Sequence, residues 1–263
     1  MKHRIGFVWI ALLCVALLPR PALAAFHLME IEQVIGGVGG DTTAQAVQLK
    51  MRTTGQNLLT TGTRVRVYDA AGANPITIKT FASNPTNALA CREILLVSPG
   101  MAAKTSPPVS ADYTFDAAIP SSYLAAGSLT FETTGGSVYW RVNWGGAAYT
   151  GPTTVVAGIG GVANDADGLT APAFAGPLPS TSAKALKFSP TCDLTTGLST
   201  NSAADYAVTA TSATITNNSA TSFAVVAPPP IPGLPGVSRY LLPALLGLGV
   251  IAFAISRRRG TAA

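Results

Sequence analysis

The stretch SLTFETTGGSVYWRVNW, residues 128–144, decides the fold class. Its two halves, 128–133 and 137–144, are rich in β-branched and aromatic residues, which favour strands. Between them, Thr134-Gly135-Gly136 supplies the small residues of a tight turn. The pattern therefore predicts a β-hairpin.

The tryptophans of the second strand, Trp140 and Trp144, allow two interpretations. Side chains alternate along a strand, so both lie on one face together with Val142. Facing inward, they would form part of a sandwich core, which is the favoured interpretation. Facing outward, two indoles about 13 Å apart could stack on sugar rings. The opposite face of the strand carries Tyr139, Arg141 and Asn143.

Short strand-like runs recur on both sides of the hairpin, separated by Gly, Asn, Pro and Asp. EILLVS (93–98) is continuously apolar, which predicts a strand buried on both faces. In TRVRVYD (63–69), valines alternate with Arg64, Arg66 and Tyr68. A single helical turn is expected within 120–128. The pattern predicts an all-β sandwich, whose other strand-like runs are 46–52, 184–189, 205–210, 213–217 and 222–227.

The amino-terminal part of the predicted sandwich resembles the lamin-tail type of immunoglobulin-like domain. The matching pieces are the Glu30-Ile31 pair, the Val47-Gln48-Leu49 core and the Asp69-Ala70-Ala71-Gly72 turn. The family more often has an acidic residue where Gln48 stands. The resemblance implies an immunoglobulin-like β-sandwich and no catalytic residues.

The formal charge of +5 comes from the two ends of the chain. Residues 25–238 contain 10 basic and 12 acidic side chains, a net charge of −2. A basic patch able to hold a phosphate backbone is therefore not expected, and neither is nucleic acid as a partner.

The amino terminus has the three parts of a secretory signal peptide, residues 1–24. A basic start, Met1-Lys2-His3-Arg4, precedes the apolar run 5–18, and Ala22-Leu23-Ala24 matches a signal-peptidase site. The pattern predicts Sec-type export and removal of this segment.

The carboxy-terminal region predicts a stalk, a membrane anchor and a sorting signal. A proline-rich stalk (227–238) precedes an expected transmembrane helix (239–256) and a basic cytoplasmic tail (257–263). Together they resemble the PEP-CTERM class of sorting signals and its Ile-Pro-Thr-Leu relative, which implies processing by an exosortase-like enzyme. A plain single-span anchor is the alternative. The positions that match the sorting signal are Ile231, Pro232, Gly233, Leu234, Pro235, Arg257, Arg258 and Arg259.

Two cysteines, Cys91 and Cys192, remain after removal of the signal peptide. In an exported chain such a pair more often forms a disulfide than a metal site. Two free buried thiols are the alternative.

Catalytic and metal-binding patterns are weak. His27 is the only histidine outside the signal peptide, so a Ser-His-Asp site is not expected. Asn164, Asp165 and Asp167 resemble part of a calcium loop. A further acidic ligand is missing from the residues that follow, so a plain turn is favoured. No cofactor other than this weak calcium candidate is expected.

These features predict an exported, non-enzymatic protein with one β-sandwich ectodomain, residues 25–226. It would face the periplasm or exterior on a membrane anchor, and reach the cell surface or extracellular matrix after processing. The expected role is structural or adhesive, with extracellular polysaccharide as a potential partner. The alternatives are a carbohydrate-binding module that uses Trp140 and Trp144, or a plain membrane-anchored protein.

Overall fold

In the residues that it describes, the computed structural model consists of β-sheets with a few short helices, which confirms the all-β part of the prediction. Helices in the described part are short: η1 (Leu59–Thr61), η2 (Pro99–Lys104), η3 (Ser121–Tyr123), η4 (Gly146–Ala148) and α2 (Ser202–Asp205). None of them is long and apolar enough to cross a bilayer. The described residues are 26–153, 173–190, 192 and 202–227.

Several predicted features lie outside the described residues. They are the signal peptide (1–24), the sorting motif (231–235), the transmembrane helix (239–256), the basic tail (257–263), and the calcium candidates Asn164, Asp165 and Asp167.

The strands of the described residues form three sheets. The largest has the order β11 (Tyr206–Val208), β10 (Leu186–Phe188), β1 (Met29–Ile35), β2 (Ala46–Met51), β5 (Glu93–Val97) and β7 (Tyr113–Thr114). The second has the order β4 (Ile76–Thr80), β3 (Thr63–Tyr68), β8 (Gly127–Thr133) and β9 (Val138–Trp144). The smallest has the order β12 (Thr214–Thr216), β13 (Ser222–Val225) and β6 (Thr105–Ser106).

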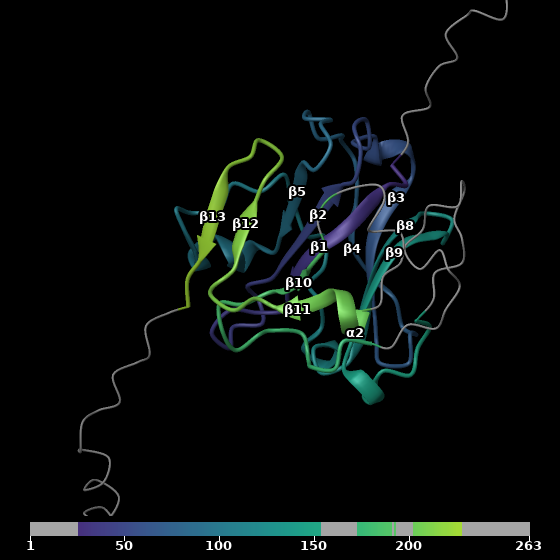
Figure 1. The fold of residues 1–263 in the computed structure, drawn as a ribbon, viewed down its shortest axis with the longest axis vertical. Coiled ribbons are helices and arrows are strands. Elements are labelled where there is room, and N and C mark those ends of the chain that lie inside the picture. Colours follow the sequence, from purple (N-terminus) through teal and green to yellow (C-terminus); the bar gives the residue numbers. More distant parts are fainter. Residues whose placement is uncertain (1–25, 154–172, 191, 193–201, 228–263) are drawn as a thin grey trace, which may run out of the picture. The chain divides into compact units, whose positions relative to one another are not determined.

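The six-stranded sheet is the middle layer, between the four-stranded and the three-stranded sheet (Figure 1). In β5, Ile94 and Leu96 enter the first core, which faces the four-stranded sheet. Leu95 and Val97 enter the second core, which faces the three-stranded sheet. The predicted burial of this run on both faces is confirmed, and it explains why its sequence does not alternate.

The predicted hairpin is β8 and β9, which pair antiparallel. Its turn is closed by a hydrogen bond from the Thr133 amide to the Ser137 carbonyl, at 2.8 Å. Gly136 has a φ of +95° there, a left-handed conformation that glycine adopts without steric cost. The glycine in the sequence thus fixes where the chain reverses.

A chain of hydrogen bonds crosses the first core. Trp140 Nε1 donates to Tyr206 Oη at 2.8 Å, and the tyrosine hydroxyl donates to the Ile31 carbonyl. These residues belong to β9, β11 and β1, so the chain joins the two sheets. Trp144 is also fully buried, and its Nε1 donates to the Tyr123 carbonyl at 2.9 Å. Both indoles therefore occupy the core with their N–H groups paired, as the favoured interpretation predicted. The prediction that Tyr139 lies on the opposite face is wrong: its side chain is buried in the same core, because the pairing of β8 and β9 shifts register next to it.

The strand-like runs predicted from the sequence all contain strands. The turn expected within 120–128 is the 3-10 helix η3. The sequence pattern missed β1, β4, β6 and β7, of which the last two have only two residues each. Strand β1 contains the Glu30-Ile31 pair, and Ile31 lies opposite Leu49 of β2.

Candidate functional site

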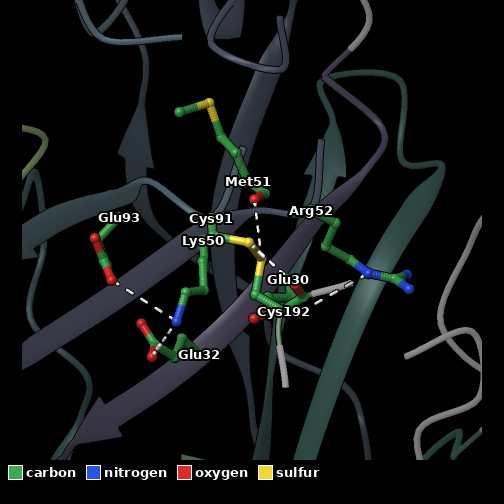
Figure 2. Close-up of a disulfide and its surroundings, with 8 residues drawn as sticks. All are labelled: Glu30, Glu32, Lys50, Met51, Arg52, Cys91, Glu93 and Cys192. Carbon is green, nitrogen blue, oxygen red and sulfur yellow. Dashed lines mark hydrogen bonds and ion pairs between the residues drawn. A yellow bond between two sulfur atoms is a disulfide. The ribbon is translucent and has the colours of Figure 1, made fainter. Parts of the chain in front are cut away.

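The disulfide between Cys91 and Cys192 closes a sequence separation of 101 residues, so the predicted bond is confirmed. Cys91 lies just before β5, and its amide donates to the Met51 carbonyl at the end of β2, at 2.7 Å. Cys192 belongs to the segment between β10 and α2. The bond thereby ties that segment to the middle of the six-stranded sheet, beside charged residues of β1 and β2 (Figure 2).

An ion network lies next to the disulfide. Lys50 Nζ lies 2.8 Å from Glu32 Oε1 and 3.7 Å from Glu93 Oε1, as Figure 2 shows. Lys187 Nζ approaches the same Glu32 oxygen at 3.5 Å, and the Gln48 amide donates to the other oxygen. Burial of Lys50 disfavours its charge, but the attraction of Glu32 outweighs it and raises the pKa. The network connects four strands through its own members, which indicates a structural role.

A second polar group covers the outer face of the four-stranded sheet. It forms rows across β3, β8 and β9, because residues that pair in a sheet lie on the same face. One row runs from Arg66 through Thr130 to Arg141, and Arg64 pairs with Glu132 beside it. We call this surface the arginine face, and its residues are Arg64, Arg66, Tyr68, Ser128, Thr130, Glu132, Arg141 and Asn143.

Glu132 organises the arginine face from below. Its carboxylate is fully buried and accepts hydrogen bonds from Arg64 Nε at 2.7 Å and Arg66 Nη1 at 3.4 Å. Tyr68 Oη and Thr130 Oγ1 donate to its other oxygen, at 2.8 and 2.9 Å. Burial raises the pKa of Tyr68, and the bond to Glu132 adds to the rise. The buried charge therefore holds two guanidinium groups and a phenol in fixed positions.

The Tyr68 ring lies close to two guanidinium groups. Arg66 Cζ is 5.5 Å from the centre of the ring, and Arg141 Cζ is 6.0 Å from it. These distances are in the range of cation–π contacts. Since Tyr68 comes from β3 and Arg141 from β9, their side chains meet above β8. The result is a layer of arginine, tyrosine and arginine over Ser128 and Thr130, which are fully buried.

The segment after β9 bounds one end of the arginine face. Arg141 Nη1 donates to the Pro152 carbonyl at 3.1 Å, and the Thr150 amide donates to the Ala70 carbonyl at 2.7 Å. Gly72, in the turn after β3, has a φ of +70°, and a Cβ there would lie 2.4 Å from Pro152 Cδ. Glycine is therefore required at this position for the segment to approach the turn.

A cleft of about 640 Å³ opens at another end of the sandwich, between the β1–β2 loop, η2 and the segment after β7. Gln45 fixes one wall, because its side-chain amide exchanges two hydrogen bonds of 2.8 Å with the backbone of Ile119. Asp116 lines the cleft, and its carboxylate is bonded to Lys79 Nζ at 2.6 Å. The residues that line the cleft offer hydroxyl and apolar groups.

The other candidate residues from the sequence analysis, His27, Trp140 and Trp144, pack against neighbouring side chains. His27 lies just before β1, with its ring 6.3 Å from that of Tyr139, and burial lowers its pKa. Trp140 and Trp144 are 1% and 0% exposed, so neither ring is open to a sugar. Within the part of the chain that the structure describes, no three His, Cys, Asp or Glu side chains gather as a metal site would require.

The arginine face was not recognised as one site from the sequence. The available signal was the outward position of Arg64, Arg66, Tyr68 and Arg141 on two alternating strands. Comparison of the chain with family models, with curated proteins and with solved structures gives no match.

Proposed function

We propose that this protein is an exported, non-enzymatic component of the bacterial cell surface or extracellular matrix, with a structural or adhesive role. The β-sandwich is its ectodomain, of the immunoglobulin-like, lamin-tail-like kind. The proline-rich stalk and the apolar segment 239–256 form a sorting tag that an exosortase-like enzyme reads and removes.

The disulfide between Cys91 and Cys192 carries the proposal. Cytosolic thiols are kept reduced, whereas disulfides form and persist in the periplasm and outside the cell. The bond thus agrees with the signal-peptide pattern of residues 1–24 and with the membrane topology that the arginines at 257–259 favour.

A plain single-span anchor is the second candidate. It predicts the same export and the same ectodomain, and it differs only in the fate of the tail. It is favoured by the arginines that follow the apolar segment, because such residues stop transfer and stay cytoplasmic.

Cell fractionation of a host that expresses the full chain tests the proposal. We expect the protein in the surface or extracellular fraction, with Cys91 and Cys192 unreactive toward a thiol reagent until a reductant is added. A cytoplasmic protein with two reactive thiols would contradict the proposal. A cytoplasmic enzyme followed in the same samples controls for lysis.

A further inference from the structure

We propose that the cleft between the β1–β2 loop, η2 and the segment after β7 binds a neutral saccharide. The inference rests on the proposed function in one respect, because a protein of the extracellular matrix meets polysaccharides there. The cleft supports it through its size, its charge and the accessible hydrogen-bonding groups of its lining.

The cleft is a preformed space. Its volume of about 640 Å³ lies within the range of small-molecule sites. Buried side chains hold both of its walls in place. Gln45 is fully buried and exchanges two hydrogen bonds with the backbone of Ile119 in one wall. Ser98 Oγ is also buried and donates to the Thr43 carbonyl in the other wall. Because these walls are already fixed, a ligand loses little affinity by ordering them.

The charge of the cleft suits a neutral ligand. Among the described residues that line it, Asp116 is the only charged one. The Asp116 side chain is 46% exposed, and its carboxylate lies 2.6 Å from Lys79 Nζ and accepts the Thr80 amide at 2.9 Å. These two bonds leave about two of its four lone-pair sites free. A hydroxyl group can donate to the free sites in a charge-assisted hydrogen bond, whereas an anionic ligand would be repelled by the carboxylate.

Polar groups that lack a partner line the cleft where solvent reaches it. Ser121 is exposed and Thr42 is half-buried, and neither hydroxyl is hydrogen-bonded within the part of the chain that the structure describes. The same holds for the backbone N–H and C=O groups of Ala117 and Ala118. The lining therefore offers both donors and acceptors at close spacing. Each hydroxyl group of a sugar donates and accepts, so a saccharide can satisfy this mixture.

The remaining lining groups are apolar and can contact the carbon atoms of a sugar ring. Pro99 is exposed and Pro120 is half-buried. Phe115 is only 8% exposed, so stacking on its ring contributes little, and we expect a dissociation constant of about 0.1 to 1 mM. A peptide would suit the apolar groups, but it has one backbone donor and one acceptor per residue. The density of donors and acceptors thus favours a saccharide over a peptide.

Calorimetric titration of the exported full chain with neutral oligosaccharides of glucose, galactose and mannose tests the inference. We expect at least one of them to bind. Its affinity should change by less than about twofold between ionic strengths of about 0.01 M and 0.15 M, because a neutral ligand is not screened. Polygalacturonate and a peptide of alternating alanine and proline should bind at least about tenfold more weakly. Absence of saccharide binding would overturn the inference, and so would tighter binding of the peptide.

Two substitutions of equal size locate the site. A118F places a ring at an exposed position of the cleft wall and should weaken saccharide binding by about tenfold or more, because it fills the space. A103F places the same ring at an exposed position of η2 outside the lining and should change binding by less than about twofold. Thermal melting checks that both variants fold, as expected for exposed positions. Equal effects of the two substitutions on binding would overturn the inference.

Hydrogen exchange gives a second measurement that requires no substitution. The amides of Ala117 and Ala118 have no hydrogen-bond partner among the described residues, so they should exchange fast in the free protein. The bound oligosaccharide should slow exchange in residues 115–121 and leave residues 206–211 unchanged. Unchanged exchange in 115–121 would overturn the inference. A protein that reaches the cell surface but binds no saccharide refutes this inference alone, whereas a cytoplasmic protein refutes the proposed function.

Discussion

Arg64 Nε lies 2.7 Å from Glu132 Oε1, and this contact places a fully buried carboxylate under a partly exposed guanidinium. Burying a carboxylate is costly unless hydrogen bonds and an opposite charge compensate it. Here four donors from β3 and β8 supply that compensation. The arginine face that these contacts organise therefore contributes to the stability of the sheet.

Substitution of Glu132 by glutamine should destabilise the fold. It leaves the buried donors without their charged acceptor, and we expect a loss of about 2 to 4 kcal/mol in the free energy of unfolding. The measurement is urea unfolding of both proteins. D116N is the matched control, because Asp116 forms an ion pair with Lys79 at the surface and should cost at most about 1 kcal/mol. Equal losses of unfolding free energy in E132Q and D116N would show that the buried Glu132 carboxylate stabilises the fold no more than a surface ion pair does.

The hydroxyl of Tyr206 should matter more than that of another paired tyrosine. Y206F removes the acceptor of Trp140 Nε1 and the donor to the Ile31 carbonyl, both inside the core. We expect a loss of about 1 to 3 kcal/mol. Y123F removes one exposed bond, to the Asn74 carbonyl, and should cost less than about 1 kcal/mol. Thermal melting of the two variants checks the difference, and similar values would refute it.

Loss of the disulfide should destabilise the protein mainly through the unfolded chain. A bond that closes 101 residues contributes about 4–5 kcal/mol in the chain-entropy model. We expect C91S with C192S to lower the free energy of unfolding by a matching amount. The far-ultraviolet circular dichroism of the folded protein should stay unchanged. Reduction of the unsubstituted protein should reproduce this shift. A variant as stable as the parent would show that the disulfide does not stabilise the protein by constraining the unfolded chain.

Asp41 should make stability depend on pH in acid. The Thr43 side chain bonds one carboxylate oxygen at 2.6 Å, the Thr43 amide bonds the same oxygen, and Lys104 lies 3.1 Å from the other. Hydrogen bonds from Thr43 and the contact with Lys104 lower the pKa of Asp41 to about 2. The folded pKa is below the unfolded value of about 3.9. The stabilisation is thus complete above about pH 4 and is lost as pH falls through about 2.

D41N isolates that contribution. Asparagine keeps an acceptor for Thr43 but removes the charge, so the variant should be less stable than the parent at pH 7. Unfolding measured at several pH values should show the two proteins converging between about pH 4 and about pH 2. A difference that stays constant over this range would exclude the carboxylate charge as its cause.

Strand positions and their faces were predictable from local sequence. In β3 and β9, alternation placed valines and tryptophans inward and arginines outward, and the structure agrees for these residues. Tyr139 is the exception, because a register shift between β8 and β9 turns its side chain into the core. In β5, continuous apolar residues predicted burial on both faces. These predictions succeed because side-chain direction in a strand depends only on neighbouring positions.

Pairing between distant segments was not predictable. Arg66 and Arg141 share a row only because each of them pairs with Thr130 of β8, the strand between theirs. The three-stranded sheet depends on contacts such as those of Gln33 and Gln48, which hydrogen-bond the backbone of β12. Nothing in the local sequence specifies these partners. The arginine face and the three-stranded sheet can therefore be recognised only when the complete fold is known.

Mass spectrometry of the carboxy terminus of the exported protein tests the proposed function most directly. A sorting tag predicts that the mature chain begins at Ala25 and ends before Arg257, with Cys91 still bonded to Cys192. A plain anchor predicts an intact Arg257, Arg258 and Arg259 in most molecules. That result would contradict the processed tail, and an unprocessed Met1 together with free thiols would contradict export itself.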